Sequence, residues 1–342
     1  MPANMPSPSS APQHEPGARP RVIVTRKLAP SVETRMSELF DVVLNVDDHP
    51  FSRDELAAAM ADCDALVPTV TDALDADLIA GAGDRLKLLA NFGAGVDHID
   101  LKAARARGII ITNTPGVFTD DTADMTMALI LSVPRRLAEG EKLVRSGQWE
   151  GWSPSGMLGH RIGGKQLGIV GMGRIGQAVA HRARGFGMDV RYHNRRRLPD
   201  SLEQMLGASF EPDLDALVSQ SDIITLHCPR SPETRGLIDA RRIGLMKPSA
   251  YLINTARGEI VDETALIGAL ESGAIAGAGL DVYTHEPRVD SRLLALRNVV
   301  LLPHVGSATF EGREVAGEKV IANIRFWFDG HRPPDQVLEG WM

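Results

Sequence analysis

The sequence predicts an α/β protein with two doubly wound parallel-sheet domains, and three observations support this prediction. Short apolar runs alternate with helical stretches along most of the 342 residues. The runs are apolar throughout rather than at every second position, which is typical of parallel strands covered by helices on both faces. A glycine-rich turn follows one of these runs near the middle of the chain.

The first domain is expected to follow a proline-rich segment, residues 1–20, which we interpret as a disordered tail because it has little apolar content. Ser52, with Glu55 three positions later, predicts a capping box at the start of a helix that runs to Cys63. Another helix is expected from Ser31 to Phe40. The expected strands are Val22–Val24, Val42–Leu44, Ala65–Val67, Leu88–Ala90 and Ile109–Ile111.

A long helix is expected to connect the two domains. Thr119 should cap it, because Asp120 and Asp121 follow in what would be the first turn. Pro134 should kink or interrupt this helix, since proline cannot donate the backbone hydrogen bond that a helix interior needs.

The second domain is expected to contain the complete dinucleotide-binding fold. A last helix, from Thr309 to Phe328, is too little for a third domain and should return to pack on the first. We therefore expect a flavodoxin-like domain, residues 21–117 and 305–342, with a Rossmann dinucleotide-binding domain, residues 118–304, inserted into it. The six expected strands of the inserted domain are Gln166–Val170, Asp189–His193, Ile223–Leu226, Tyr251–Asn254, Gly277–Leu280 and Val299–Leu302.

The glycine-rich turn has the Gly-x-Gly-x-x-Gly spacing, between a strand and a helix, that is typical of pyrophosphate binding. Gly171 permits the tight turn, Gly173 lets the backbone approach the pyrophosphate, and Gly176 lets the helix pack closely on the strand. Arg174 and Ile175 begin the helix, whose free N–H groups and dipole favour an anion.

The end of the next strand indicates which nicotinamide cofactor is bound. An NAD site carries an acidic residue there, which bonds the ribose 2′-OH. Asn194 takes that position, and Arg195, Arg196 and Arg197 follow it. Guanidinium groups can bind a 2′-phosphate, so we predict NADPH/NADP as the cofactor. A solvated basic turn is the alternative.

Composition limits the other partners. The net charge of −7, from 44 acids and 37 bases, gives no reason to expect nucleic-acid binding. The apolar runs are all shorter than the roughly 20 residues that cross a bilayer, so no membrane association is expected. Cys63 and Cys228 stand alone, outside any metal-ligand spacing. They favour a reducing, cytoplasmic location, and no metal site is expected.

Three polar residues follow the ends of expected strands, where catalytic groups gather in such sheets. These residues are Arg257, Glu286 and His304. In the first domain, the glycines of residues 91–97 also lie between a strand end and a helix, and they suit either a ligand site or a simple tight turn.

Several separated motifs, in this order, resemble those of the D-isomer-specific 2-hydroxyacid dehydrogenases, and more closely those of glyoxylate/hydroxypyruvate reductases. The resemblance runs from about Arg21 to the C-terminus. The matching segments are Gly93-Ala94-Gly95-Val96-Asp97-His98, Asn113-Thr114-Pro115-Gly116, Thr122-Ala123-Asp124, the glycine turn, Asn254-Thr255-Ala256-Arg257-Gly258 and the segments around Glu286 and His304.

The resemblance implies the roles of the site residues in reducing a small 2-oxo acid. His304 would donate the proton, Glu286 would hold its imidazole and stabilise the protonated form, and Arg257 would bind the carboxylate and polarise the carbonyl. The backbone N–H groups of Ala94 and Gly95 would bind the substrate carboxylate, which makes residues 21–117 and 305–342 the substrate-binding domain. Besides the glycine turn and the basic segment, the implied cofactor contacts are Thr122, Cys228, Pro229, Thr255, Ala256, Asp281, His304 and Gly306.

The resemblance also implies a homodimer. Trp149 and Trp152 could wall the substrate site, contact a partner subunit or lie in a core. Alternative functions within this fold remain open. They are a phosphoglycerate dehydrogenase-like enzyme and a nucleotide-sensing binding protein similar to the C-terminal-binding-protein corepressors. Formate dehydrogenases usually pair the histidine with glutamine, so Glu286 argues against that activity.

Overall fold

The computed structural model describes residues 18–338, which form two units with one parallel sheet each. Within the described residues, unit 1 comprises 18–117 and 309–338, and unit 2 comprises Phe118–Ala308. Most of the expected tail, residues 1–17, lies outside the described residues.

Unit 1 has five parallel strands in the order β2-β1-β3-β4-β5, the order of flavodoxin-like sheets. The strands are β1 (Arg21–Val24), β2 (Asp41–Val43), β3 (Ala65–Val67), β4 (Leu88–Ala90) and β5 (Ile110–Thr112). The helices of this unit are α1 (Pro30–Leu39), α2 (Arg53–Asp62), α3 (Ala76–Ala80), α4 (Leu101–Ala106) and α13 (Phe310–Phe328).

Two local predictions in unit 1 are confirmed. The hydroxyl of Ser52 accepts a hydrogen bond from the N–H of Glu55, whose carboxylate accepts one from the N–H of Ser52, so the capping box is complete. The final helix α13 does pack on unit 1, against α1 and β4. The approach is close, since a Cβ added to Gly317 would lie 2.3 Å from Cγ2 of Val32.

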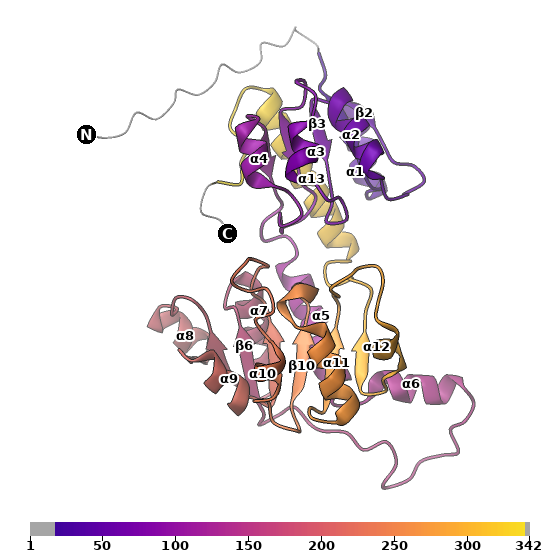
Figure 1. Ribbon diagram of the computed structural model, residues 1–342, viewed down its shortest axis with the longest axis vertical. Coiled ribbons are helices and arrows are strands. Elements are labelled where there is room, and N and C mark those ends of the chain that lie inside the picture. Colours follow the sequence, from indigo (N-terminus) through magenta and orange to yellow (C-terminus); the bar gives the residue numbers. More distant parts are fainter. Residues whose placement is uncertain (1–17, 339–342) are drawn as a thin grey trace. The chain divides into compact units, whose positions relative to one another are not determined.

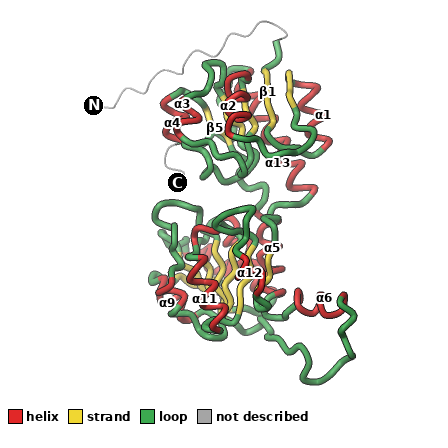
Figure 2. Tube along the Cα trace, turned by 45° about the vertical axis from the view of Figure 1, so that its right-hand side comes forward, coloured by secondary structure: helices red, strands yellow, loops and turns green. Residues whose placement is uncertain are grey.

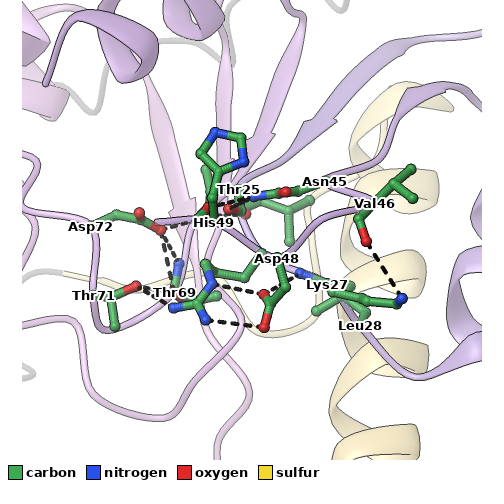
Figure 3. A network of polar contacts seen from close by, with 12 residues as sticks. Thr25, Lys27, Leu28, Asn45, Val46, Asp48, His49, Thr69, Thr71 and Asp72 are labelled. Atoms are coloured by element: carbon green, nitrogen blue, oxygen red, sulfur yellow. Dashed lines mark hydrogen bonds and ion pairs between the residues drawn. The ribbon is translucent and has the colours of Figure 1, made fainter. Parts of the chain in front are cut away.

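A polar network ties together the loops that follow β1, β2 and β3 at the carboxyl edge of this sheet (Figure 3). The Asp72 carboxylate, which is buried, accepts hydrogen bonds from the Thr25 hydroxyl at 2.6 Å and the Thr69 N–H at 2.7 Å. The Asn45 amide donates to the carbonyl oxygens of Thr25, at 2.8 Å, and His49, at 2.7 Å. These bonds fix the loops of one half of the edge.

Unit 2 has seven parallel strands in the order β12-β11-β10-β9-β6-β7-β8, which contains the Rossmann order with one further strand. They are β6 (Gln166–Val170), β7 (Asp189–His193), β8 (Ala208–Phe210), β9 (Ile223–Leu226), β10 (Tyr251–Asn254), β11 (Gly277–Leu280) and β12 (Val299–Leu301). Strands β6 and β10 of this sheet are labelled in Figure 1. The helices are α5 (Thr119–Ser132), α6 (Leu137–Arg145), α7 (Arg174–Gly185), α8 (Asp200–Leu206), α9 (Leu214–Gln220), α10 (Ala240–Ile243), α11 (Glu263–Ser272) and α12 (Ser291–Ala295).

Helices cover both faces of this sheet, which explains the continuous apolar runs. Leu167 and Ile169 of β6 join a core with residues of α5 and α7, whereas Val170 joins a core with residues of α9, α10 and α11. Successive residues of a strand point to opposite faces, so a strand buried on both sides needs an apolar residue at every position.

The prediction of six strands was wrong by one, because β8 was missed. It has three residues, lies at the edge of the sheet, and has Ala208 as its only buried residue, so it lacks a run of buried apolar residues. The predicted Thr119 cap was also wrong. Phe118 occupies the N-cap position and no side chain caps α5. The interruption expected at Pro134 is present, since α5 ends at Ser132 and α6 begins at Leu137.

Helix α6 and the loop that follows it form an arm, residues 137–160, that extends away from the rest of unit 2 (Figure 2). Helix α6 buries none of its residues. Trp149 and Trp152 lie on the arm with exposed fractions of 57% and 84%, so the alternative that they lie in a core of this chain was wrong. In residues 18–338, no helix combines the length and the apolar character needed to cross a membrane.

Candidate active site

The carboxyl ends of the strands of unit 2 share one edge, and the strand order reverses there between β6 and β9. From β6 the chain proceeds to β7 and β8 on one side, and from β9 to β10, β11 and β12 on the other. Loops that leave in opposite directions open a crevice at such a switch point, where open α/β sheets bind their ligands.

The glycine turn lies at this switch point, directly after β6. Gly171 has φ 98°, and a Cβ there would lie 2.5 Å from the backbone nitrogen of Cys228. A Cβ on Gly176 would lie 2.3 Å from the carbonyl oxygen of Gly171, so both positions exclude larger residues. A Cβ on Gly173 would meet no atom within 4 Å, so the space above this glycine is open.

The start of helix α7 can hold a phosphate group. Gly173 is its N-cap residue and no side chain caps the helix, so its first N–H groups remain available. Gly173 and Arg174 are exposed, Ile175 is half-buried and Gly176 is buried. The open space and the uncapped helix end fit a pyrophosphate, and the residues of the turn would hold it.

The basic segment after β7 separates into free and paired arginines. Arg197 donates to the Glu203 carboxylate at 2.7 Å and lies 3.1 Å from Asp200. Arg195 and Arg196 are exposed, and neither guanidinium group makes a hydrogen bond or ion pair within residues 18–338. The Asn194 amide donates to the carbonyl oxygen of Arg196 at 3.0 Å, which folds the segment into a tight turn. The turn thus presents two uncommitted positive charges.

Asp281, directly after β11, holds three consecutive backbone N–H groups of the loop after β12. Its carbonyl oxygen accepts from His304 at 2.9 Å, and its carboxylate oxygens accept from Val305 at 2.8 Å and Gly306 at 2.7 Å. The residue is 1% exposed, and burial raises the pKa of its carboxyl group against the lowering effect of these N–H groups. His304 has φ 55°, a left-handed conformation that few residues with a side chain adopt.

His304 and Glu286 form the central pair of the site. Nδ1 of His304 lies 2.8 Å from Oε2 of Glu286, and Oε1 of Glu286 accepts the backbone N–H of Tyr283 at 3.0 Å. Burial acts to raise the pKa of Glu286, but the hydrogen bond and charge of His304, the Tyr283 N–H and the charge of Arg257 outweigh it, so the pKa is lowered. Glu286 is therefore a carboxylate at neutral pH.

Arg257 follows β10 and lies near this pair. A Cβ on the next residue, Gly258, would lie 2.0 Å from the carbonyl carbon of Tyr283, so the two loops touch. The Asn254 side chain donates to the Arg257 carbonyl oxygen at 2.8 Å and accepts the Ala256 N–H at 3.0 Å, which fixes the turn. Arg257 is half-buried.

A second group of expected cofactor contacts surrounds this site within unit 2. The Thr126 hydroxyl lies 2.9 Å from that of Thr255 and donates to the carbonyl oxygen of Thr122 at 2.7 Å. A Cβ on Gly306 would lie 3.7 Å from Cγ2 of Thr122. Thr122 and Thr255 are thereby tied to each other, and Thr122 lies beside Gly306.

Two expected contacts lie in the loop after β9. The backbone of Cys228 faces Gly171 and Pro229 is exposed. Burial raises the pKa of the Cys228 thiol to about 11, so it is neutral near pH 7. In the part of the chain that the structure describes, no three His, Cys, Asp or Glu side chains are grouped as metal ligands.

The loop expected to bind the substrate carboxylate, Ala94 and Gly95, belongs to unit 1, after β4. Its carbonyl oxygens are all occupied. Those of Gly93 and Gly95 accept from the Asn91 amide at 3.0 and 2.9 Å, and that of Ala94 accepts from the Asn113 amide at 2.8 Å. Within the described ranges, the N–H groups of Ala94 and Gly95 have no hydrogen-bond acceptor. Two adjacent free N–H groups can bind an anion.

Sequence reasoning assigned no role to Asn91, Asn113 or Thr126. A buried polar residue cannot be recognised from one sequence, but an asparagine two positions before Gly93 could have indicated a side chain that bonds its own backbone. The bridging role of Thr126 has no such local signal, because its partner Thr255 is 129 residues away.

The sequence and the fold match known proteins. Residues 127–306 match the model of the D-isomer specific 2-hydroxyacid dehydrogenase, NAD binding domain. A glyoxylate reductase of Thermococcus litoralis is 45% identical over 323 residues, which are 93% of this chain and 97% of that protein. A glyoxylate reductase of Pyrococcus furiosus is 43% identical over 93% of this chain and 95% of its own length.

Solved structures agree over nearly the whole chain. One is the TT0316 protein of Thermus thermophilus, with a TM-score of 0.86 and 43% identity over 93% of this chain and 100% of that one. Another is an NADPH-dependent glyoxylate/hydroxypyruvate reductase of Sinorhizobium meliloti in complex with NADP and malonate. Its TM-score is 0.84, with 36% identity over 94% of this chain and 98% of that chain.

Proposed function

The chain belongs to the D-isomer-specific 2-hydroxyacid dehydrogenase family, and we propose that it reduces glyoxylate and hydroxypyruvate to 2-hydroxy acids with NADPH. The observation that carries the proposal is the His304–Glu286 pair next to Arg257, at the same sheet edge as the open glycine turn. A proton donor, a carboxylate-binding cation and a dinucleotide site are the groups that this reduction needs. The names of the relatives supply the substrate class.

The residues divide the chemistry between them. When bound, the cofactor supplies the hydride that reduces C2 of the oxo acid. Glu286 occupies Nδ1 of His304, so Nε2 is the nitrogen that donates the proton to the carbonyl oxygen. Arg257 binds the carboxylate and polarises the carbonyl group. The free N–H groups of Ala94 and Gly95, in unit 1, would also bind the substrate carboxylate.

The preference for NADPH rests on the turn after β7. Arg195 and Arg196 are the uncommitted charges there, and the Asn194 side chain carries no charge that would repel a 2′-phosphate. The Sinorhizobium enzyme of the same fold is described as NADPH-dependent. The rest of the cofactor would be surrounded by the residues of the glycine turn and by Thr122, Cys228, Pro229, Thr255, Ala256, Asp281 and Gly306.

The protein also functions as a homodimer in this proposal, with the arm as part of the interface. Trp149, Trp152 and Leu158 expose 57%, 84% and 66% of their surface on the arm, more than an isolated soluble domain usually leaves to water in one place. A second copy of the chain would cover them. The two free thiols, Cys63 and Cys228, support a cytoplasmic location.

An absorbance assay tests the proposed activity. NADPH oxidation at 340 nm should be rapid with glyoxylate and with hydroxypyruvate, and slower with NADH as the donor. The matched control is His304→Ala, which removes the proton donor and leaves the glycine turn and the basic segment after β7 unaltered. Tight NADPH binding without turnover on any small 2-oxo acid would contradict the proposal and favour a nucleotide-sensing binding protein.

A further inference from the structure

We infer that Asn91 and Asn113 are positioning residues that form a clamp on the carboxylate-binding loop and set the direction of its free N–H groups. The inference rests on the proposed function for the identity of the anion, a 2-oxo acid carboxylate. It extends that function to two side chains that do not touch the substrate themselves.

The clamp is built on two neighbouring strands. Asn91 directly follows β4 and Asn113 directly follows β5, and these strands pair in register, with Ala90 opposite Thr112. The N–H of Asn91 donates to the Thr112 carbonyl oxygen at 3.0 Å. The two asparagines therefore lie side by side at the carboxyl edge, on rigid elements, with exposed fractions of 1% and 2%.

Every polar atom of the Asn91 side chain is used. Its amide nitrogen donates to Gly93 O and Gly95 O, and its oxygen lies 3.0 Å from Nε2 of His98. An amide oxygen only accepts, so His98 donates this bond and fixes which way the amide faces. The Asn113 nitrogen takes the remaining carbonyl, that of Ala94, and the N–H of Thr114 donates to Gly93 O at 3.0 Å.

Peptide geometry turns this clamp into an anion site. In a planar trans peptide, the carbonyl of one residue and the N–H of the next point in opposite directions. Holding Gly93 O inward therefore points the Ala94 N–H away from the clamp, and holding Ala94 O inward does the same for the Gly95 N–H. Glycine at positions 93 and 95 leaves these two N–H groups unshielded by larger side chains.

Loss of the clamp should change KM rather than kcat. The carboxylate does not change charge during reduction, so N–H groups that bind it act equally in the ground state and the transition state. Loss of such uniform binding raises KM and leaves kcat nearly unchanged. A role in the chemical step would lower kcat instead.

The test uses isosteric variants of the full-length protein. Asn91→Asp and Asn113→Asp replace the donor nitrogen with a carboxylate oxygen that repels the loop carbonyls, at constant volume. Each should raise KM for glyoxylate about ten- to a hundredfold, with kcat within about threefold of wild type and NADPH affinity unchanged. A KM within threefold of wild type in both folded variants, or a loss confined to kcat, would overturn the inference.

Asn45→Asp is the matched control. Asn45 is also buried at the same edge and also donates to two backbone carbonyls (Figure 3), but β1 and β3 lie between its strand, β2, and β4. The Asn45→Asp variant should lower the stability of the protein about as much as Asn91→Asp and Asn113→Asp do, but its KM for glyoxylate should stay within threefold of wild type. An equal rise of KM in Asn45→Asp would show that any disturbance of this sheet edge weakens substrate binding, and it would overturn the inference of a clamp.

An independent readout covers variants that fold poorly and separates the two proposals. The probe is oxamate, an unreactive analogue of a 2-oxo acid, added to the NADPH complex of the wild-type protein. It should shift the backbone 15N–1H signal of Gly95, which is assigned by its disappearance in the Gly95→Ala variant. Asn113→Ala should require at least tenfold more oxamate for the same shift, and an unchanged requirement would overturn the clamp. Wild-type protein that shifts with oxamate but reduces no 2-oxo acid would refute the proposed function alone.

Discussion

Nδ1 of His304 lies 2.8 Å from Oε2 of Glu286, although the two residues are 18 positions apart. Both are placed by the loops after β11 and β12 rather than by a regular element. Asp281 fixes one of these loops through three N–H groups, and the Tyr283 N–H fixes the Glu286 carboxylate. The pair therefore depends on main-chain hydrogen bonds as much as on its own contact.

His304→Ala should lower kcat for glyoxylate reduction by about 10²–10⁴-fold, the usual contribution of a positioned proton donor. Steady-state kinetics with saturating NADPH measures this. NADPH affinity, followed by cofactor fluorescence, should stay near the wild-type value, because the glycine turn is unaltered. Near-normal turnover in the variant would rule out His304 as the donor.

Asp281→Asn should reduce kcat by about a hundredfold, because small misplacements of a catalytic group have effects of this size. An asparagine has one acceptor oxygen, so one of the N–H groups of Val305 and Gly306 loses its partner. His304 then loses the support for its left-handed backbone. Rapid-mixing kinetics should place the loss in the chemical step, and a kcat equal to wild type would contradict this support.

Glu286→Gln should destabilise the protein more at pH 7 than at pH 4. The pKa of Glu286 is lowered from its ordinary value of 4.5, so its contribution to stability is fully present above that value. This contribution is lost as pH falls through the folded-state pKa, and glutamine has no such contribution. Urea unfolding at the two pH values measures the difference, and a gap between wild type and variant that does not change with pH would argue against it.

Arg195→Ser and Arg196→Ser should each raise KM for NADPH about ten- to a hundredfold, because charge-assisted bonds to the 2′-phosphate are lost. KM for NADH should stay within threefold. Arg197→Ser is the control, since Glu203 and Asp200 already occupy this side chain, and it should leave the preference between the cofactors unchanged. Equal effects on both cofactors would refute a 2′-phosphate site.

Gly173→Ala and Gly176→Ala should separate binding from folding. The new methyl group at position 173 meets no atom within 4 Å, so thermal stability should be unchanged while NADPH affinity falls. At position 176 it lies 2.3 Å from the Gly171 carbonyl oxygen, which should destabilise the protein by about 1–3 kcal/mol. Calorimetry and NADPH titration of both variants measure the two effects. An unchanged affinity in Gly173→Ala would argue against a pyrophosphate at this turn.

Most strands were predictable because their apolar runs are buried on two faces and so differ from the neighbouring segments. The run at Gln166–Val170 is an example, with four of its five residues buried. Strand β2, at the edge of its sheet, is an exception, since Asp41 and Val43 are exposed. Strand β8 could not be found in this way, because its burial comes only from Ala208 and from the packing of Phe210 on Tyr192. Strand β8 forms because the segment pairs with β7, and its own sequence has no strand pattern.

The types of residue in the site could be predicted from the sequence, but the hydrogen bonds and backbone conformations that position them could be predicted only in part. Arg257 and His304 follow strands that the apolar runs predict, so their shared edge could be inferred. The left-handed backbone of His304 could not, because it depends on the distant Asp281. The bonds of Asn91 and Asn113 likewise require the pairing of β4 with β5, which no local pattern encodes.

The return of α13 to unit 1 has a consequence for the order in which the protein is made. Unit 2 is continuous in the sequence, whereas unit 1 needs α13, whose Gly317 packs on Val32 of α1. A ribosome delivers residues 118–308 before it delivers this helix. Unit 2 can therefore complete its core during synthesis. Strands β1–β5 are made first, but unit 1 cannot complete its packing until α13 has been synthesised.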